Sequence, residues 1–196
     1  MKNFILYMAL FIGGISFANN ATAQADTQHI KFKGVSLGEN FGTFIEKLKQ
    51  KGFRRMATED EGMLSGQFYY DPVYISISTS PVSEVISSVL VFFLTEHTFE
   101  TVSLDYSNYL GSLSEKYGKP TNLSDTSTYV PLNKTYREYS STLQRNGKKY
   151  TASWVLPEGE IKLNISEDYI LTLTYYDRIN LDISNKEFKQ VIDKEF

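Results

Sequence analysis

The amino-acid sequence predicts an α+β fold, in which two repeats of a helix followed by antiparallel strands form one curved sheet with helices on one face. Two segments have the apolar spacing of amphipathic helices, and each is followed by segments that alternate like strands. The turns between these strands are too short for a parallel crossover, which favours antiparallel hairpins. We expect residues 26–97 and 98–196 to form the two repeats within a single globular domain.

Residues 1–25 have the three parts of a secretory signal peptide: a lysine near the start, an apolar run over 4–18, and a small-residue end. The apolar run is shorter than the about 20 residues that a membrane-spanning helix needs. Two overlapping A-x-A sites leave open whether cleavage follows Ala23 or Ala25. We therefore expect export to the periplasm or the extracellular space, with no membrane span after cleavage.

The first repeat begins with a predicted helix over 36–53. Ser36 and Glu39 have the spacing of a capping box, and Gly52 has the position of a helix stop. The apolar residues of this segment fall on one helical face: Phe41, Phe44, Ile45 and Leu48. Three strands are predicted to follow, over 64–70, 73–80 and 85–94.

The second repeat begins with a predicted helix over 98–117, which Gly118 and Pro120 end. Its apolar stripe consists of Val102, Tyr106, Tyr109, Leu113 and Tyr117. Four strands are predicted after it, over 137–143, 148–156, 160–166 and 169–176. A short C-terminal helix over 184–194 is expected to dock through Phe188, Val191 and Ile192.

Composition excludes several classes of function. The chain has no cysteine, so disulfides, thiolate nucleophiles, cysteine-ligated metals and lipid attachment through a cysteine are excluded. Its formal net charge is −3 and it has no run of Lys or Arg, which makes nucleic acid and anionic lipid poor partners. An exported chain without disulfides suits a bacterial envelope better than a eukaryotic secretory route. We expect no cofactor and no metal.

One short motif has the pattern of a catalytic site, but its context argues against one. Residues 34–38 match the G-x-S-x-G nucleophile elbow. An elbow needs parallel strands laid down before it and a suitably placed histidine after it, and neither is predicted here. His29 and His97 are interpreted as surface or capping residues, and Ser36 as a helix cap. We therefore expect no enzymatic activity.

Two surfaces are candidates for binding. The last strands alternate cleanly, so one face of their sheet is expected to be wet and to carry polar side chains. These candidate contact residues are Lys149, Thr151, Lys162, Asn164, Thr172, Thr174 and Tyr176. The strand over 85–94 is apolar on both faces, so either it is central and covered on both sides or it forms an apolar interface. The interface would consist of Leu90, Phe92 and Leu94.

Tyrosine is frequent in this chain, with 14 residues, and two interpretations stay open. Tyrosine packs well in strands, with its hydroxyl at the rim of the sheet. It is also a favoured contact residue at protein interfaces and on carbohydrate-binding surfaces, because it has a flat apolar face and a polar tip.

The order of helix and strands, together with three phrases, resembles a known architecture. The phrases are Phe32-Lys33-Gly34, the helix ending at 116–120 and the strand 171–177. They resemble the β-lactamase-inhibitor-protein-like (BLIP-like) fold and a group of exported bacterial proteins of unknown function with that layout. The resemblance implies the fold and a binding style. It does not imply inhibition of a β-lactamase, because the inhibitor's cysteines and inhibitory loop residues have no match here.

Taken together, the sequence favours a non-enzymatic, exported binding module of the bacterial envelope, whose partner is another envelope protein or a glycan. Two alternatives stay open. One is a glycan-acting enzyme that uses two of the carboxylates near the strand ends, which are Glu158, Glu160, Glu167, Asp168 and Asp177. The other is an assembly protein that oligomerises through its apolar strand.

Overall fold

The computed structural model describes residues 28–57, 62–94, 98–124, 150–166 and 168–195. The predicted signal peptide, the predicted strand over 137–143 and the candidate residue Lys149 lie outside these residues. The described part is an α+β structure with three helices, an antiparallel sheet of eight strands and a separate two-stranded sheet. Within it, no helix combines the length and apolar character needed to cross a membrane.

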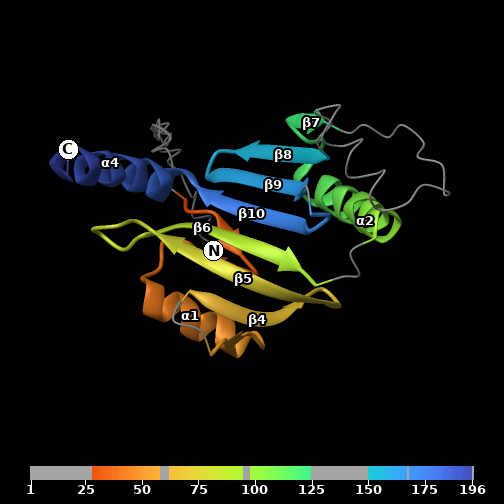
Figure 1. Ribbon diagram of the computed structural model, residues 1–196, viewed down its shortest axis with the longest axis horizontal. Coiled ribbons are helices and arrows are strands. Elements are labelled where there is room, and N and C mark those ends of the chain that lie inside the picture. Colours follow the sequence, from red (N-terminus) through yellow and green to blue (C-terminus); the bar gives the residue numbers. More distant parts are fainter. Residues whose placement is uncertain (1–27, 58–61, 95–97, 125–149, 167, 196) are drawn as a thin grey trace, which may run out of the picture.

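The large sheet has the strand order β3-β4-β5-β6-β10-β9-β8-β7, and every neighbouring pair is antiparallel (Figure 1). Its strands are β3 (Arg54–Arg55), β4 (Met63–Phe68), β5 (Asp71–Thr79), β6 (Ile86–Phe93), β7 (Asn122–Ser124), β8 (Thr151–Leu156), β9 (Gly159–Ile165) and β10 (Leu171–Asp177). At its centre β6 pairs with β10, so that Val91 is opposite Leu173. The small sheet is a hairpin of β1 (Lys31–Phe32) and β2 (Val35–Ser36).

Helix α1 (Phe41–Gln50) begins later than predicted. Its N-cap is Asn40, whose side-chain oxygen accepts a hydrogen bond from the Thr43 backbone N–H at 2.9 Å. The predicted Ser36 capping box is therefore wrong, because Ser36 belongs to β2 and Glu39 pairs with Lys47 instead. The predicted apolar face is confirmed: Phe44, Ile45 and Leu48 are buried and Phe41 packs against them.

Helix α2 (Phe99–Tyr117) matches its prediction. Thr98 is the N-cap, and the chain leaves the helix at Gly118, whose φ is 82°. The carbonyl of Gly118 accepts a hydrogen bond from the Trp154 indole at 2.8 Å, which ties the end of α2 to β8. The predicted stripe is confirmed, since Val102, Tyr106, Tyr109 and Leu113 are buried and Tyr117 packs against them.

The longer strands were predicted and the shortest were not. Strands β4, β5, β6, β8, β9 and β10 lie within a few residues of the predicted segments. The predicted strands over 64–70 and 73–80 leave out Asp71 and Pro72, but both residues belong to β5, and the turn is made by Tyr69 and Tyr70. Pro72 is the second residue of β5, and its carbonyl accepts from the backbone N–H of Leu94 at 3.0 Å.

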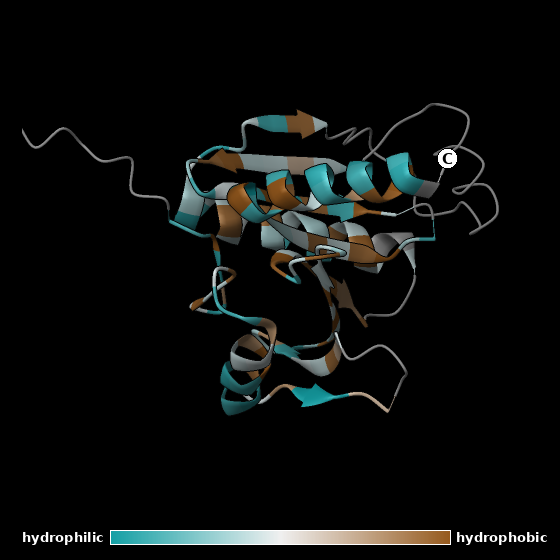
Figure 2. Ribbon diagram, turned by 90° about the vertical axis from the view of Figure 1, so that its left-hand side faces the viewer, coloured by the Kyte–Doolittle hydropathy of each residue, from teal (hydrophilic) through white to brown (hydrophobic). Residues whose placement is uncertain are grey.

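Helix α4 (Arg178–Glu195) starts directly after β10 and extends beyond the end of the sheet (Figure 1). The predicted docking residues are wrong, because Phe188, Val191 and Ile192 are all exposed. Apolar and polar residues alternate along the helix (Figure 2). The buried contacts are polar instead: Asn180 donates from Nδ2 to the carbonyls of Leu37 at 3.1 Å and Ile86 at 3.0 Å.

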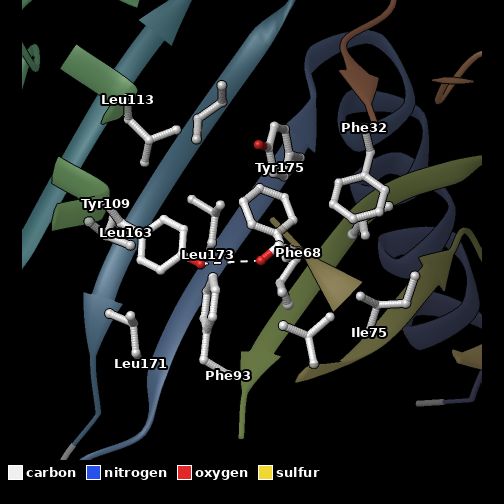
Figure 3. Close-up of a cluster of buried hydrophobic side chains, with 14 of the residues drawn as sticks. Phe32, Phe68, Ile75, Phe93, Tyr109, Leu113, Leu163, Leu171, Leu173 and Tyr175 are labelled. Carbon is white, nitrogen blue, oxygen red and sulfur yellow. Dashed lines mark hydrogen bonds between the residues drawn. The ribbon is translucent and has the colours of Figure 1, made fainter. Parts of the chain in front are cut away.

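The core lies on one face of the large sheet, under α1, α2 and the β1–β2 hairpin. Phe32 of the hairpin contacts Tyr175 of β10 with ring centroids 5.4 Å apart, and it also packs against Phe68. Figure 3 shows these rings beside Phe93 and Tyr109, so aromatic residues from both halves of the sheet meet at the centre of the core. The opposite face of the sheet has a different character and includes the candidate contact residues.

Candidate functional site

We call the face of the large sheet that points away from this core the outer sheet face. Strand register places its residues in rows that cross the strands. One row runs through Ser124, Thr151, Asn164, Thr172, Phe92 and Tyr74. The next runs through Asn122, Ser153, Lys162, Thr174, Leu90 and Ser76. The polar and the apolar candidate residues therefore lie on one continuous surface, because β6 pairs directly with β10.

The polar half of the outer sheet face is held in place by hydrogen bonds. The Thr151 hydroxyl donates to Asn164 Oδ1 at 2.8 Å, and the Thr172 hydroxyl donates to the Asn164 carbonyl at 3.3 Å. Lys162 is half-buried, and no described residue forms an ion pair with it. Thr174 differs from the others, since it is only 9% exposed and offers a partner little surface.

The remaining polar candidate, Tyr176, lies in a third row. It is opposite Glu160 of β9 and Ser88 of β6, and it is half-buried. Its phenol is thus placed near the end of the sheet where β10 continues into α4. Lys149 precedes the described residue Tyr150 and is not placed.

The apolar half of the outer sheet face lies along β6. Leu90 and Phe92 are half-buried, and Leu94, just past the end of the strand, is 39% exposed. On the core face of the same strand Val89 and Val91 are fully buried. The prediction of a central strand is confirmed, while its outer side keeps apolar surface that a partner could cover.

His29 is not the isolated surface residue that the sequence suggested. Its Nδ1 lies 3.0 Å from both carboxylate oxygens of Asp177, which is fully buried. The same carboxylate accepts from the backbone N–H groups of Ile30 at 3.0 Å and Asn180 at 2.9 Å. It therefore anchors the segment before β1 and caps α4 at once. Sequence reasoning missed this pair because 148 residues separate its members.

The G-x-S-x-G motif does not form a nucleophile elbow. Ser36 lies in the short antiparallel strand β2, and its Oγ accepts from the backbone N–H of Gly38 at 3.2 Å. A Cβ at Gly38 would lie 2.3 Å from the His29 ring, so a larger residue there would force this ring to move. Asp177 is occupied by structural hydrogen bonds, so its carboxylate is not free to serve in a glycosidase pair.

Two buried tyrosines also have structural roles. Burial raises the pKa of the Tyr109 phenol, and a hydrogen bond to Asp71 raises it further. Burial likewise raises the pKa of Tyr175, whose phenol lies beside that of Tyr117. Both phenols stay protonated at neutral pH, so they act as hydrogen-bond donors within the core.

No protein-family model, no curated protein and no solved structure matches this chain. In the described part of the chain, no group of three or more His, Cys, Asp or Glu side chains has the arrangement of a metal site. The alternation of the sequence and the pairing of β6 with β10 favour the outer sheet face as the candidate site.

Proposed function

We propose that this protein is a non-enzymatic, exported binding module of the bacterial envelope, which contacts a protein partner through the outer sheet face. The observation that carries the proposal is the continuity of polar Thr172 and Lys162 with apolar Phe92 and Leu90 across paired strands. An apolar strip beside a polar region is the usual anatomy of a protein interface.

The rigidity of this face supports a binding role. Thr151, Asn164 and Thr172 are fixed on paired strands by hydrogen bonds, so binding would cost little side-chain ordering. Lys162 lies among hydroxyl groups, with Ser153 and Thr174 as its neighbours in register. A carboxylate on the partner is the natural complement to this ammonium group.

The strand order supports the proposed BLIP-like arrangement of two repeats. Helix α1 is followed by β3 to β6, and α2 is followed by β7 to β10; each set of four strands runs from an edge of the sheet to its centre. The two sets meet at β6 and β10. The composition of residues 1–25 supports export, so the proposed partner lies in the periplasm or outside the cell.

The test uses two changes on the outer sheet face and one control. Tyr176→Ala and Lys162→Glu are each expected to weaken binding of the partner at least tenfold, measured by titration calorimetry with purified components. Lys119→Glu makes the same charge change outside the candidate rows, after the end of α2, and should leave the affinity unchanged. If neither Tyr176→Ala nor Lys162→Glu changes the affinity of the partner, the proposal that it binds through the outer sheet face is wrong.

The second candidate function is an assembly role, and the exposure of α4 favours it. Phe188 is 51% exposed and Ile192 is 55% exposed, and both belong to α4, the helix that extends beyond the end of the sheet (Figure 1). An oligomer in solution would support assembly, whereas sedimentation as a monomer at every concentration would count against it.

A further inference from the structure

Two turn residues on the core side of the sheet have an unusual backbone conformation. Lys33, at the tip of the β1–β2 hairpin, has a φ of 50°, and Tyr69, in the β4–β5 turn, has a φ of 55°. Glycine or asparagine usually occupies this left-handed region, because a side chain with a Cβ is strained there. Neither turn uses the residue that would stabilise it best, which points to a role for the two side chains themselves.

The two side chains meet each other. The Lys33 ammonium lies 5.0 Å from the centre of the Phe68 ring and 5.9 Å from the centre of the Tyr69 ring. Tyr69 packs against Phe68 and against Tyr109 of α2, with ring centroids 5.3 and 6.2 Å apart. Phe68 and Tyr109 belong to the aromatic core shown in Figure 3, so the base of the cluster is rigid.

The cluster is nevertheless open to solvent at its surface. Tyr69 is 61% exposed and its neighbour Tyr70 is 93% exposed. Exposed aromatic rings offer flat apolar surface to a ligand. The turn keeps Tyr69 although its backbone conformation is strained for a side chain with a Cβ. The cluster lies on the same side of the sheet as the β1–β2 hairpin, opposite the outer sheet face.

The charges of the cluster favour an anion. Among the described residues, no carboxylate forms an ion pair with Lys33. Partial burial lowers the pKa of Lys33, and the nearby ammonium of Lys51 lowers it further. The Asp71 carboxylate contacts Tyr109 of the same aromatic group, where it accepts the Tyr109 hydroxyl. A partly desolvated ammonium next to a second cation gains from a bound counter-ion.

We propose that Lys33 and Tyr69 form a binding site for an acidic saccharide. The apolar C–H face of a sugar ring stacks on the exposed Tyr69 ring, while its carboxylate is bound by the Lys33 ammonium, with Lys51 adding positive potential. This site is independent of the proposed protein-binding role, since it uses other residues on the other side of the sheet.

The test titrates the full exported chain with oligomers of galacturonic and mannuronic acid, with their methyl esters and with inorganic phosphate. At least one acidic oligomer is expected to bind at least tenfold more tightly than its ester and than phosphate, and binding should weaken as salt is added. Failure of both acidic oligomers to bind would overturn the proposal. Equal binding of the ester would overturn the role of charge, and equal binding of phosphate would overturn the role of the sugar.

Two variants separate ligand binding from folding. Asparagine tolerates the left-handed backbone, so Lys33→Asn should fold with an unchanged or higher Tm. Tyr69→Asn should also fold, with a lower Tm, because it loses the ring contacts with Phe68 and Tyr109. Each variant is expected to lose at least tenfold in affinity, whereas Lys189→Gln, at an exposed position of α4, should bind as the natural chain does. Full affinity in Lys33→Asn would overturn the site. A lowered Tm in that variant would show that Lys33 serves the turn itself.

Discussion

His29 Nδ1 lies 3.0 Å from both carboxylate oxygens of Asp177, and this contact joins the segment before β1 to the junction between β10 and α4. Asp177 is the last residue of β10 and is fully buried. Its oxygens also accept from the Ile30 and Asn180 backbone N–H groups. One carboxylate therefore fixes the positions of three parts of the chain.

Removing this carboxylate is expected to destabilise the fold. Asp177→Ala should lower the free energy of unfolding by about 3 kcal/mol, because it removes a helix cap and leaves buried donors unsatisfied. Urea denaturation measures the loss. Asp168→Ala is the control, since Asp168 is exposed and its removal should change the free energy by less than about 0.5 kcal/mol. Equal stability of the two variants would contradict the role of Asp177.

Glu187 is expected to make the anchoring of α4 depend on pH. Its carboxylate accepts from the backbone N–H groups of Val82 at 2.9 Å and Ser83 at 3.1 Å. Hydrogen bonds lower the pKa of Glu187 from its usual 4.5 to about 2, and the largest contribution comes from the Ser83 hydroxyl. A lowered pKa stabilises the fold fully above the unfolded value, and this contribution is lost as pH falls towards 2.

The measurement for Glu187 is a comparison of Tm between the natural chain and Glu187→Gln across pH. The natural chain should have the higher Tm at pH 7, and the difference should shrink as pH falls through the window between 4.5 and about 2. A difference that stays constant through this window would show that the carboxylate does not anchor α4.

Two glycine substitutions are expected to have opposite effects. A Cβ at Gly66 would lie 2.5 Å from the Phe53 ring, so Gly66→Ala should destabilise the fold by about 1–3 kcal/mol through overpacking. A Cβ at Gly111, inside α2, would meet nothing within 4 Å. Gly111→Ala should therefore stabilise the fold by about 0.5–1 kcal/mol. Thermal unfolding distinguishes them, and the same sign for both would contradict the packing of Phe53 on Gly66.

The docking of α4 through polar residues gives a further prediction. Asn180→Ala should cost about 2 kcal/mol, because the buried carbonyls of Leu37 and Ile86 lose their donor. Phe188→Ser should change stability by less than about 0.5 kcal/mol, because the side chain is 51% exposed. Urea denaturation measures the free energy of unfolding of both variants. A larger loss of stability for Phe188→Ser than for Asn180→Ala would show that α4 docks through its apolar residues, as the sequence predicted.

Local sequence signals were sufficient for much of the fold. The apolar spacing of Phe44, Ile45 and Leu48 identified the buried face of α1, and Thr98 with Gly118 marked the ends of α2. These features depend on residues a few positions apart. Ser36 was misread as a cap because the competing cap, Asn40, lies only four residues later and has the same chemistry.

Contacts between distant residues were beyond sequence reasoning. The start of α4 depends on Asp177, whose partners include His29 far earlier in the chain. The candidate site shows the same limit. The alternation of residues along the strands identified the polar set and the apolar set as two separate surfaces. The pairing of β6 with β10 places Leu90 and Phe92 on the same face as the polar residues. Lys33 and Tyr69 meet because two turns that are distant in sequence converge. The only local signal is the pair Lys33-Gly34, since a glycine at this point indicates a tight turn with left-handed backbone.

The most direct test of the central claim is site-specific photo-crosslinking of the protein in the cells that produce it. A photoreactive amino acid replaces Lys162 or Tyr176 on the outer sheet face, or Glu115 on the exposed side of α2 as control. We predict that positions 162 and 176 both give the same discrete adduct with a partner protein and that position 115 does not. Absence of that adduct from both outer-face positions, or an equal yield from position 115, would contradict binding through the outer sheet face.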